Sequence, residues 1–250
     1  MKHFYFVADY TARFYLNVDN IMISAGSSYE PSKKWNQWHG LKMKRLFVDS
    51  GGFTLFKKNG EYPFSLHEYC KFVYSLDEQY PLELVATLDY PCEIDVKRTK
   101  YKTNKQRIEA TVQNAVWCID YDNTLPWIPV LQGFTYEEYE YCYNLYLERG
   151  INMDYLAIGS ICSRKGNHLA IRNLLTKIHA LTNTKLHAFG LSLTYLRDPT
   201  IANILYSSDS SAWNWGVARH CDKKDAVRTY NNKLSLILSD DPQLTLTEFD

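Results

Sequence analysis

Short apolar runs recur along the whole chain, and each one ends in polar residues or glycine. The eight runs span residues 4–10, 21–27, 45–52, 82–91, 127–133, 154–160, 185–192 and 202–211. Most lack a strict alternation of apolar and polar positions, which is typical of parallel strands that are covered on both faces. We therefore expect a buried parallel sheet.

Amphipathic segments separate many of these runs. Apolar residues at helical spacing predict helices over 65–79, 136–150 and 168–183, and Gly150 is expected just past the end of the second helix. Strands that alternate with helices form βαβ units. Eight units suit a single-domain α/β fold, a (β/α)8 TIM-type barrel over residues 1–250. A doubly wound open sheet is the main alternative, but its glycine-rich phosphate motifs are absent from the sequence.

Composition narrows the class of protein. The net charge is zero, so nucleic-acid contact would need a local basic patch. The 20 tyrosines are expected mainly to pack helices on the sheet. The cysteines form no CxxC pair, and the closest approach to a metal-ligand spacing is His67 with Cys70, so we expect no metal site. Scattered cysteines are also typical of a protein in the reducing cytoplasm. The sequence has no signal peptide and no run of ~20 apolar residues, which predicts a soluble protein outside the membrane.

One segment, residues 97–107, is strongly basic. Its six cations are Lys97, Arg98, Lys100, Lys102, Lys105 and Arg107. The segment is interpreted either as the solvated start of a helix or as a contact to a phosphate backbone. In the second interpretation Lys97, Arg98, Lys100 and Lys102, together with Trp213, hold the nucleic-acid strand. The acidic tail, residues 239–250, is expected to be a surface extension.

Polar residues cluster where the predicted strands end. The candidates are Asp49, Ser50, Gly51, Gly52, Asp89, Gln132, Gly133, Gly159, Ser160, His187, Gly190 and Asp209. Strand ends converge at one mouth of a barrel, where three aspartates repel one another and raise at least one pKa. Asp49 and Asp89 also suit turn or helix caps. Three carboxylates fit Mg²⁺-dependent phosphoryl transfer or attack at a sugar carbon, and their spacing does not separate O-glycoside cleavage from base removal.

The order of these motifs resembles the tRNA-guanine transglycosylase superfamily. The matching elements are DSGGF (49–53), Asp89, LQG (131–133), YLAIGSI (155–161), HAFGLS (187–192) and Asp209, within about residues 45–215. The chain length and SSDSSAWNW (207–215) resemble the compact DpdA branch, which is associated with placing 7-deazaguanine bases in DNA, often in phages. The family's zinc-binding cysteines are absent, since His220 and Cys221 do not match them. Ser160 and Ile161 stand where the family commonly has glycine and leucine.

The resemblance implies a role for each matching residue. Asp209 would be the nucleophile that forms a covalent glycosyl-enzyme, and Asp49 would help bind the base and transfer protons. The base would contact Asp89, Gln132, Gly159, Ser160, Ser50 and Gly51 and would stack between Phe53 and Phe189. Gly51 and Gly52 would let the backbone approach the ligand.

The implied activity is that of a pentosyltransferase without a cofactor, which replaces guanine in DNA with a preQ0-like free base, in the cytoplasm, including that of a virus-infected cell. The alternatives are a tRNA-guanine transglycosylase, a non-catalytic nucleic-acid-binding partner subunit, and a hydrolase that leaves an abasic site.

Overall fold

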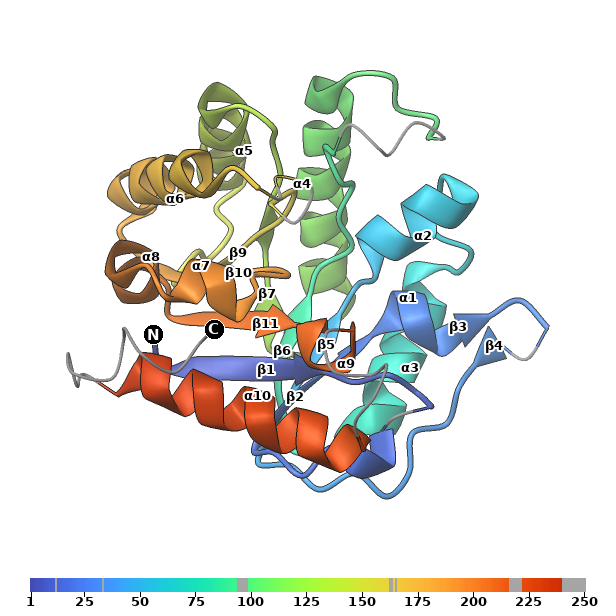
Figure 1. The fold of residues 1–250 in the computed structure, drawn as a ribbon. Helices are drawn as coiled ribbons and strands as arrows, with labels where there is room; N and C mark the ends of the chain where they lie inside the picture. Colours follow the sequence, from blue (N-terminus) through green and yellow to red (C-terminus); the bar gives the residue numbers. More distant parts are fainter. Residues whose placement is uncertain are drawn as a thin grey trace.

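The computed structural model describes residues 1–11, 13–32, 34–93, 99–161, 164, 166–215 and 222–239 (Figure 1). Lys97, Arg98, Cys162, His220 and Cys221 lie outside the described residues, as does the acidic tail after Ser239. The expectations for the tail and for the first two cations therefore concern residues that are not described.

Parallel strands form the centre of the molecule (Figure 1). They are β1 (His3–Val7), β2 (Asn20–Ser24), β5 (Arg45–Asp49), β6 (Leu82–Ala86), β7 (Trp127–Ile128), β8 (Val130–Leu131), β9 (Tyr155–Ile158), β10 (Lys185–Ala188) and β11 (Ser207–Ser210). In the sheet they follow the order β7-β6-β5-β2-β1-β11-β10-β9-β8. Each of the eight apolar runs contains a strand, and the run 127–133 contains both β7 and β8. Residues 25–27, 52 and 202–204 of these runs belong to helices instead.

The two ends of this order meet at Pro129. β7 pairs with β6, β8 pairs with β9, and only Pro129 separates β7 from β8. Proline has no backbone N–H to donate to a ladder, but the Pro129 carbonyl still accepts from the Ala157 N–H at 2.9 Å. The run 127–131 is thus one strand with a neighbour on each side, and the sheet closes. The predicted (β/α)8 barrel is confirmed, and the open sheet is excluded.

Helices surround the barrel (Figure 1). The longer ones are α2 (Gly52–Asn59), α3 (Leu66–Asp77), α4 (Asn104–Tyr121), α5 (Tyr136–Glu148), α6 (His168–Thr182) and α10 (Lys223–Leu238). The short ones are η1 (Arg13–Tyr15), α1 (Ala25–Ser28), α7 (Leu193–Leu196), α8 (Pro199–Ile204) and α9 (Ala212–Trp215), and β3 (Tyr29–Glu30) with β4 (Lys34–Trp35) forms a small antiparallel hairpin.

Capping explains where several helices begin and end. Ser65, Thr103 and Thr135 each form a capping box that starts α3, α4 and α5. α5 ends before Gly150, whose φ of 64° suits a glycine past a helix end. The helices predicted over 65–79, 136–150 and 168–183 are confirmed as α3, α5 and α6.

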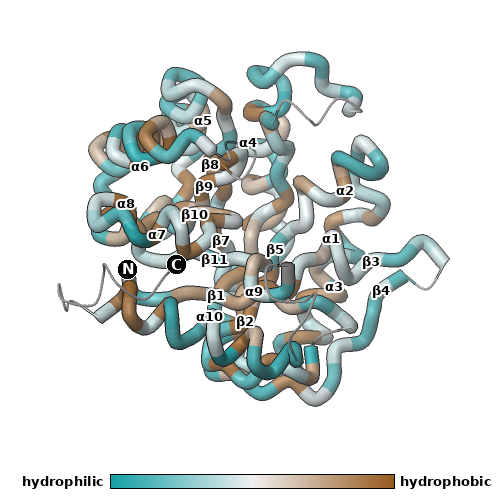
Figure 2. The backbone as a smooth tube through the Cα atoms, in the orientation of Figure 1, coloured by the Kyte–Doolittle hydropathy of each residue, from teal (hydrophilic) through white to brown (hydrophobic). Residues whose placement is uncertain are grey.

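Two layers of apolar side chains support this arrangement. Inside the barrel, one cluster contains Tyr5, Met22, Phe47, Leu84, Ala86, Ile128, Val130 and Ala157. A larger cluster fills the space between the strands and the helices. Figure 2 shows the hydrophobic residues gathered along the strands and the hydrophilic ones over the outer helices. The inner cluster fills the barrel below the strand ends.

Buried tyrosines anchor helices to strands. The hydroxyls of Tyr69, Tyr139 and Tyr146 donate to the carbonyls of Ala86, Gly159 and Val130 at 2.9, 2.7 and 2.9 Å. All three tyrosines are fully buried, so each carbonyl would lack a water partner if the hydroxyl were removed. The expectation that tyrosines pack helices on the sheet holds for these three.

We expect Tyr146→Phe to lower the free energy of unfolding by about 1–3 kcal/mol, because the Val130 carbonyl would be buried without a donor. Tyr146→Ala should cost about 3–5 kcal/mol, since it also leaves a cavity. Urea denaturation followed by circular dichroism would measure both. Tyr15→Phe, at a tyrosine that is 37% exposed, is the control. Equal stability of wild type and Tyr146→Phe would contradict the anchoring role.

Candidate active site

Three aspartates from distant parts of the chain meet at the carboxyl ends of the strands. Asp49 ends β5, Asp89 follows β6, and Asp209 lies in β11 opposite Tyr5 of β1. The charges of both Asp89 and Asp209 act on Asp49. Asp89 and Asp209 are almost completely buried, with 7% and 3% of their surface exposed. The three aspartates that the sequence selects are therefore neighbours in space.

The carboxyl group of Asp49 has a strongly raised pKa. Burial and then the charge of Asp89 raise its pKa to about 7, and a hydrogen bond from Ser24 partly opposes this shift. A carboxyl group with this pKa is present in both protonation states near neutral pH. Such a group can both release and accept a proton during a reaction.

Asp89 is held by side chains on both of its oxygens. Ser50 donates to Oδ1 and Gln132 donates to Oδ2, each at 2.5 Å. The Tyr62 hydroxyl accepts from the Asp89 N–H at 3.0 Å and donates to the Asp89 carbonyl at 2.8 Å. Burial raises the pKa of Asp89, and the bonds from Ser50 and Gln132 lower it. These contacts fix the orientation of the carboxyl group.

The hydrogen bonds continue from Gln132 to the loop after β9. The Ser160 hydroxyl lies 2.5 Å from Gln132 Oε1 and 3.0 Å from Glu93 Oε2, and it accepts from the Cys92 N–H at 2.8 Å. Ser160 has a φ of 55°, a left-handed conformation that favours glycine.

Gly159 lies in close contact with the Gln132 side chain. A Cβ at this position would lie 2.2 Å from Gln132 Nε2. Only glycine therefore lets the Gln132 side chain lie against this loop.

Asp209 has a separate set of partners. His187 Nε2 lies 3.2 Å from Asp209 Oδ1, and the Gly190 N–H donates to the same oxygen at 3.0 Å. His187 is fully buried, and its Nδ1 lies 2.6 Å from the Ser207 hydroxyl. The carboxylate is thus oriented by a side chain and by a backbone N–H.

The aromatic and glycine positions differ in their surroundings. Phe53 and Phe189 are both partly buried, and Phe189 packs edge-on against His187 at 4.7 Å.

Gly51 has a φ of 73°, and a Cβ there would lie 2.0 Å from the Gly26 nitrogen. A Cβ on Gly52 would meet the Tyr62 hydroxyl and Asp89 at 3.0–3.1 Å. Gly51 is therefore required by the close approach of Gly26, whereas a side chain at Gly52 would press on Tyr62 and Asp89.

The described cations of the basic segment, residues 97–107, have different surroundings. Lys100 lies over the Tyr101 ring, and Lys102 donates to the Thr99 carbonyl at 3.2 Å. Arg107 is buried and donates to the Pro91 carbonyl at 3.3 Å, so it supports the fold rather than a surface patch. Trp213 is fully buried and donates to the Val7 carbonyl at 3.0 Å. The prediction that Trp213 holds a nucleic-acid strand is wrong, because its ring is covered by the core.

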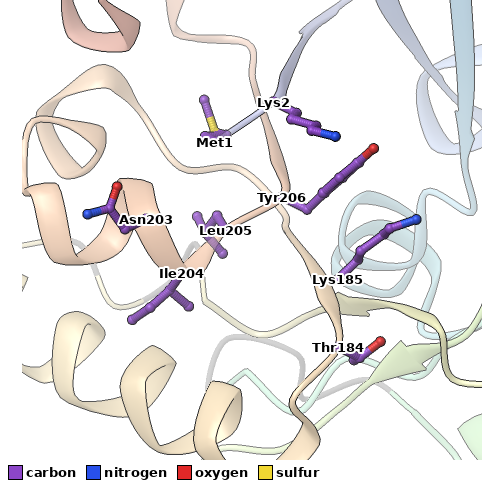
Figure 3. A pocket seen from close by; sticks show the side chains of 8 residues that line it. All are labelled: Met1, Lys2, Thr184, Lys185, Asn203, Ile204, Leu205 and Tyr206. Atoms are coloured by element: carbon purple, nitrogen blue, oxygen red, sulfur yellow. The ribbon is translucent and has the colours of Figure 1, made fainter. Parts of the chain in front are cut away.

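A pocket of about 350 Å³ lies at the opposite end of the barrel (Figure 3). Its lining residues are Met1, Lys2, Thr184, Lys185, Asn203, Ile204, Leu205 and Tyr206. They stand at the amino ends of β1, β10 and β11. This pocket is therefore separate from the aspartates, which stand at the carboxyl ends.

Sequence reasoning left three residues of this site without a role. The position of His187 at a strand end makes it a candidate in the sequence. Its contact with Asp209, however, depends on the pairing of β10 with β11. Glu93 lies only four residues after Asp89, so proximity to that motif could have indicated it. Tyr62 lies in a loop, and no pattern in the sequence connects it to Asp89.

Comparison with known proteins identifies one family. Residues 40–229, more than half of the chain, match the family model described as DpdA: DeoxyPurine in DNA protein A. No curated protein matches the chain. Among the described residues, no helix has the length and apolar character needed to cross a membrane. The same residues contain no group of three or more His, Cys, Asp or Glu side chains arranged to hold a metal ion.

The raised pKa of Asp49 should appear in the stability of the protein. Because its pKa is about 7 when folded and near 3.8 when unfolded, the folded state binds more protons between these values. Wild-type stability therefore falls as pH rises through this range. We expect Asp49→Asn to gain stability relative to wild type from about pH 4 to pH 7 and to keep a constant advantage above it.

Urea denaturation across this pH range would measure the difference. Asp120→Asn, which removes an exposed carboxylate, is the matched control. A stability difference between Asp49→Asn and wild type that does not vary with pH would contradict the shifted pKa.

Proposed function

The chain belongs to the DpdA family, and on this premise we propose that it replaces guanine in DNA with a 7-deazaguanine base through a covalent aspartyl-glycosyl intermediate. Membership of the family supports a DNA-guanine transglycosylase-like enzyme. The observation that carries the more specific reaction is the convergence of Asp49, Asp89 and Asp209 at one end of the barrel in three different environments. Each environment suits a different step of base exchange.

The first step uses Asp209 and Asp49. A carboxylate oxygen of Asp209 attacks C1′ of the target nucleotide, and the bond from C1′ to N9 of guanine breaks. The electron pair of that bond leaves with the base, and protonated Asp49 donates a proton to it. With a pKa of about 7, Asp49 carries this proton in a large fraction of molecules at neutral pH.

The second step reverses the first with a different base. The incoming 7-deazaguanine gives its N9 proton to the Asp49 carboxylate and attacks C1′, which frees Asp209. Protons and bonds balance over the two steps, so the exchange needs no external reductant or oxidant. A target in duplex DNA must first be flipped out of the stack, which costs roughly a few kcal/mol.

Asp89 and Gln132 are suited to hold the base. Each carboxylate oxygen accepts in two directions, and Ser50 and Gln132 occupy one direction on each. The remaining directions can accept from N1–H and the exocyclic amine of guanine. Gln132 Nε2 keeps a second hydrogen for O6, beside the Ser160 backbone. Phe53 and Phe189 would stack on the rings, and Lys100 and Lys102, with Lys97 and Arg98, would contact phosphates.

The deciding experiment supplies purified protein with DNA or tRNA and with labelled guanine or preQ0. Mass spectrometry of the digested nucleosides then identifies the product. Incorporation into DNA supports the proposal, and incorporation only into tRNA would instead support the tRNA alternative. Release of guanine without incorporation would indicate a hydrolase. No change in either polymer would overturn the proposed reaction.

We expect Asp209→Asn to abolish the covalent adduct between protein and DNA, because a neutral amide is a poor nucleophile at a sugar carbon. Denaturing gel electrophoresis of protein trapped on labelled DNA would detect the adduct. Asp198→Asn, at a carboxylate that caps α8 and pairs with Arg172, is the control at an aspartate outside the proposed site. An adduct of undiminished yield with Asp209→Asn would place the nucleophile elsewhere.

Asp89→Asn should raise KM for guanine by about 10-fold or more and change the rate of adduct decay less. The amide replaces one acceptor by a donor that faces the donors of guanine, which costs about 1–3 kcal/mol. Steady-state exchange of labelled guanine would measure KM. The same KM in the variant and in wild type would remove Asp89 from base recognition.

A further inference from the structure

A chain of buried hydrogen bonds leads away from Asp209 into the barrel. Asp209 Oδ1 contacts His187 Nε2 at 3.2 Å, His187 Nδ1 contacts Ser207 Oγ at 2.6 Å, and Ser207 Oγ contacts the Tyr155 hydroxyl at 2.5 Å. His187 and Ser207 are fully buried. The reaction described above uses none of these three partners, so their polar atoms need another explanation.

The direction of each bond follows from the chemistry of the groups. A carboxylate only accepts, so His187 Nε2 must carry the proton that faces Asp209. In a neutral imidazole the other nitrogen then accepts, and the donor available to it is the Ser207 hydroxyl. Ser207 in turn accepts from the Tyr155 hydroxyl. The chain therefore has one consistent direction, and it ends in a donor aimed at the carboxylate.

Packed rings hold the imidazole in place. Phe47 and Phe189 pack edge-on against His187 at 4.8 and 4.7 Å, and Tyr5 does so at 6.1 Å. The ring therefore has little freedom to turn its Nε2 away from Asp209. The Gly190 N–H, from the turn after β10, adds a second donor to the same oxygen at 3.0 Å.

These contacts make the two oxygens of Asp209 unequal. Oδ1 accepts from both His187 and Gly190, so its lone pairs are occupied. No side chain or backbone N–H of the described residues donates a hydrogen bond to Oδ2, and it is the oxygen left for attack. When the ester forms, Oδ1 becomes its carbonyl oxygen and keeps both donors.

We propose that His187 is a positioning residue, which holds Asp209 by Oδ1 and thereby presents Oδ2 to the sugar carbon, with Ser207 and Tyr155 keeping the proton on Nε2. This inference rests on the proposed function, because it assigns an atom to the nucleophile. It adds a role for a histidine that the proposed reaction steps leave unused. The chemical step should therefore depend on a donor at one defined position of the histidine ring.

Two substitutions of similar size separate this role from simple filling of the core. The amide nitrogen of a glutamine lies three bonds beyond Cβ, as Nε2 does, so His187→Gln retains a donor toward Asp209. The amide of an asparagine lies where Nδ1 does, so His187→Asn retains the contact to Ser207 and loses the donor. Losing a hydrogen bond to a charged group lowers a rate by about 10- to 100-fold.

The experiment measures kcat, KM for the labelled base, adduct yield on DNA and thermal stability for both variants. We expect His187→Asn to lose kcat by about 10- to 100-fold with KM within about 3-fold of wild type. His187→Gln should retain at least about 10-fold more kcat than His187→Asn. Equal kcat in two folded variants would overturn the proposal. If wild type forms no adduct with DNA or tRNA, the proposed function itself fails, which is a distinct result.

A third variant decides the matter if substitutions of His187 prevent folding. Ser207→Ala leaves the imidazole in place and removes the donor to Nδ1. A lower kcat at unchanged KM would support the proposal, and a wild-type kcat would overturn it. A crystal structure of the trapped ester should also show the oxygen that contacts Gly190 as the carbonyl oxygen. An ester bond at that oxygen would contradict the assignment.

Discussion

Three carboxyl groups confined at one end of a closed barrel are the central physical constraint on this protein. Burial alone disfavours the charged form of an acid, and neighbouring negative charges add to the penalty. The surroundings that offset this repulsion differ between the three positions, and the three aspartates therefore have different chemical properties. Asp49 takes a pKa of about 7, Asp89 is surrounded by donors, and Asp209 is oriented by His187 and Gly190.

The barrel makes this confinement possible. Parallel strands place their carboxyl ends at one rim, and closure at Pro129 brings β6 and β9 to the two sides of one strand. Tyr69, Tyr139 and Tyr146 then fix the surrounding helices to strand carbonyls. The close approaches at Gly51 and Gly159 allow loops to pack without space for a side chain. The loops at the rim are therefore closely packed where the carboxylates stand.

Two hydrogen-bond networks at the rim of the barrel serve different parts of the proposed reaction, one binding the base and the other orienting the nucleophile. The bonds that connect Ser50, Asp89, Gln132, Ser160 and Glu93 form a polar wall suited to a planar base with several donors. The bonds that connect Asp209, His187, Ser207 and Tyr155 lie on β9, β10 and β11 and end at the nucleophile. Asp49, between them, is the acid whose pKa is matched to proton transfer at neutral pH.

The sequence alone determined the strand positions and the rim residues, because buried parallel strands are read as apolar runs and their polar ends are local in sequence. It also determined α3, α5 and α6 through periodicity and the Gly150 stop signal. Only the tertiary structure decided that Trp213 and Arg107 are buried, that His187 faces Asp209, and that Tyr62 and Glu93 join the site. Those facts depend on strand pairing and on loops that meet across the barrel, and such long-range contacts leave no periodic signal in one sequence.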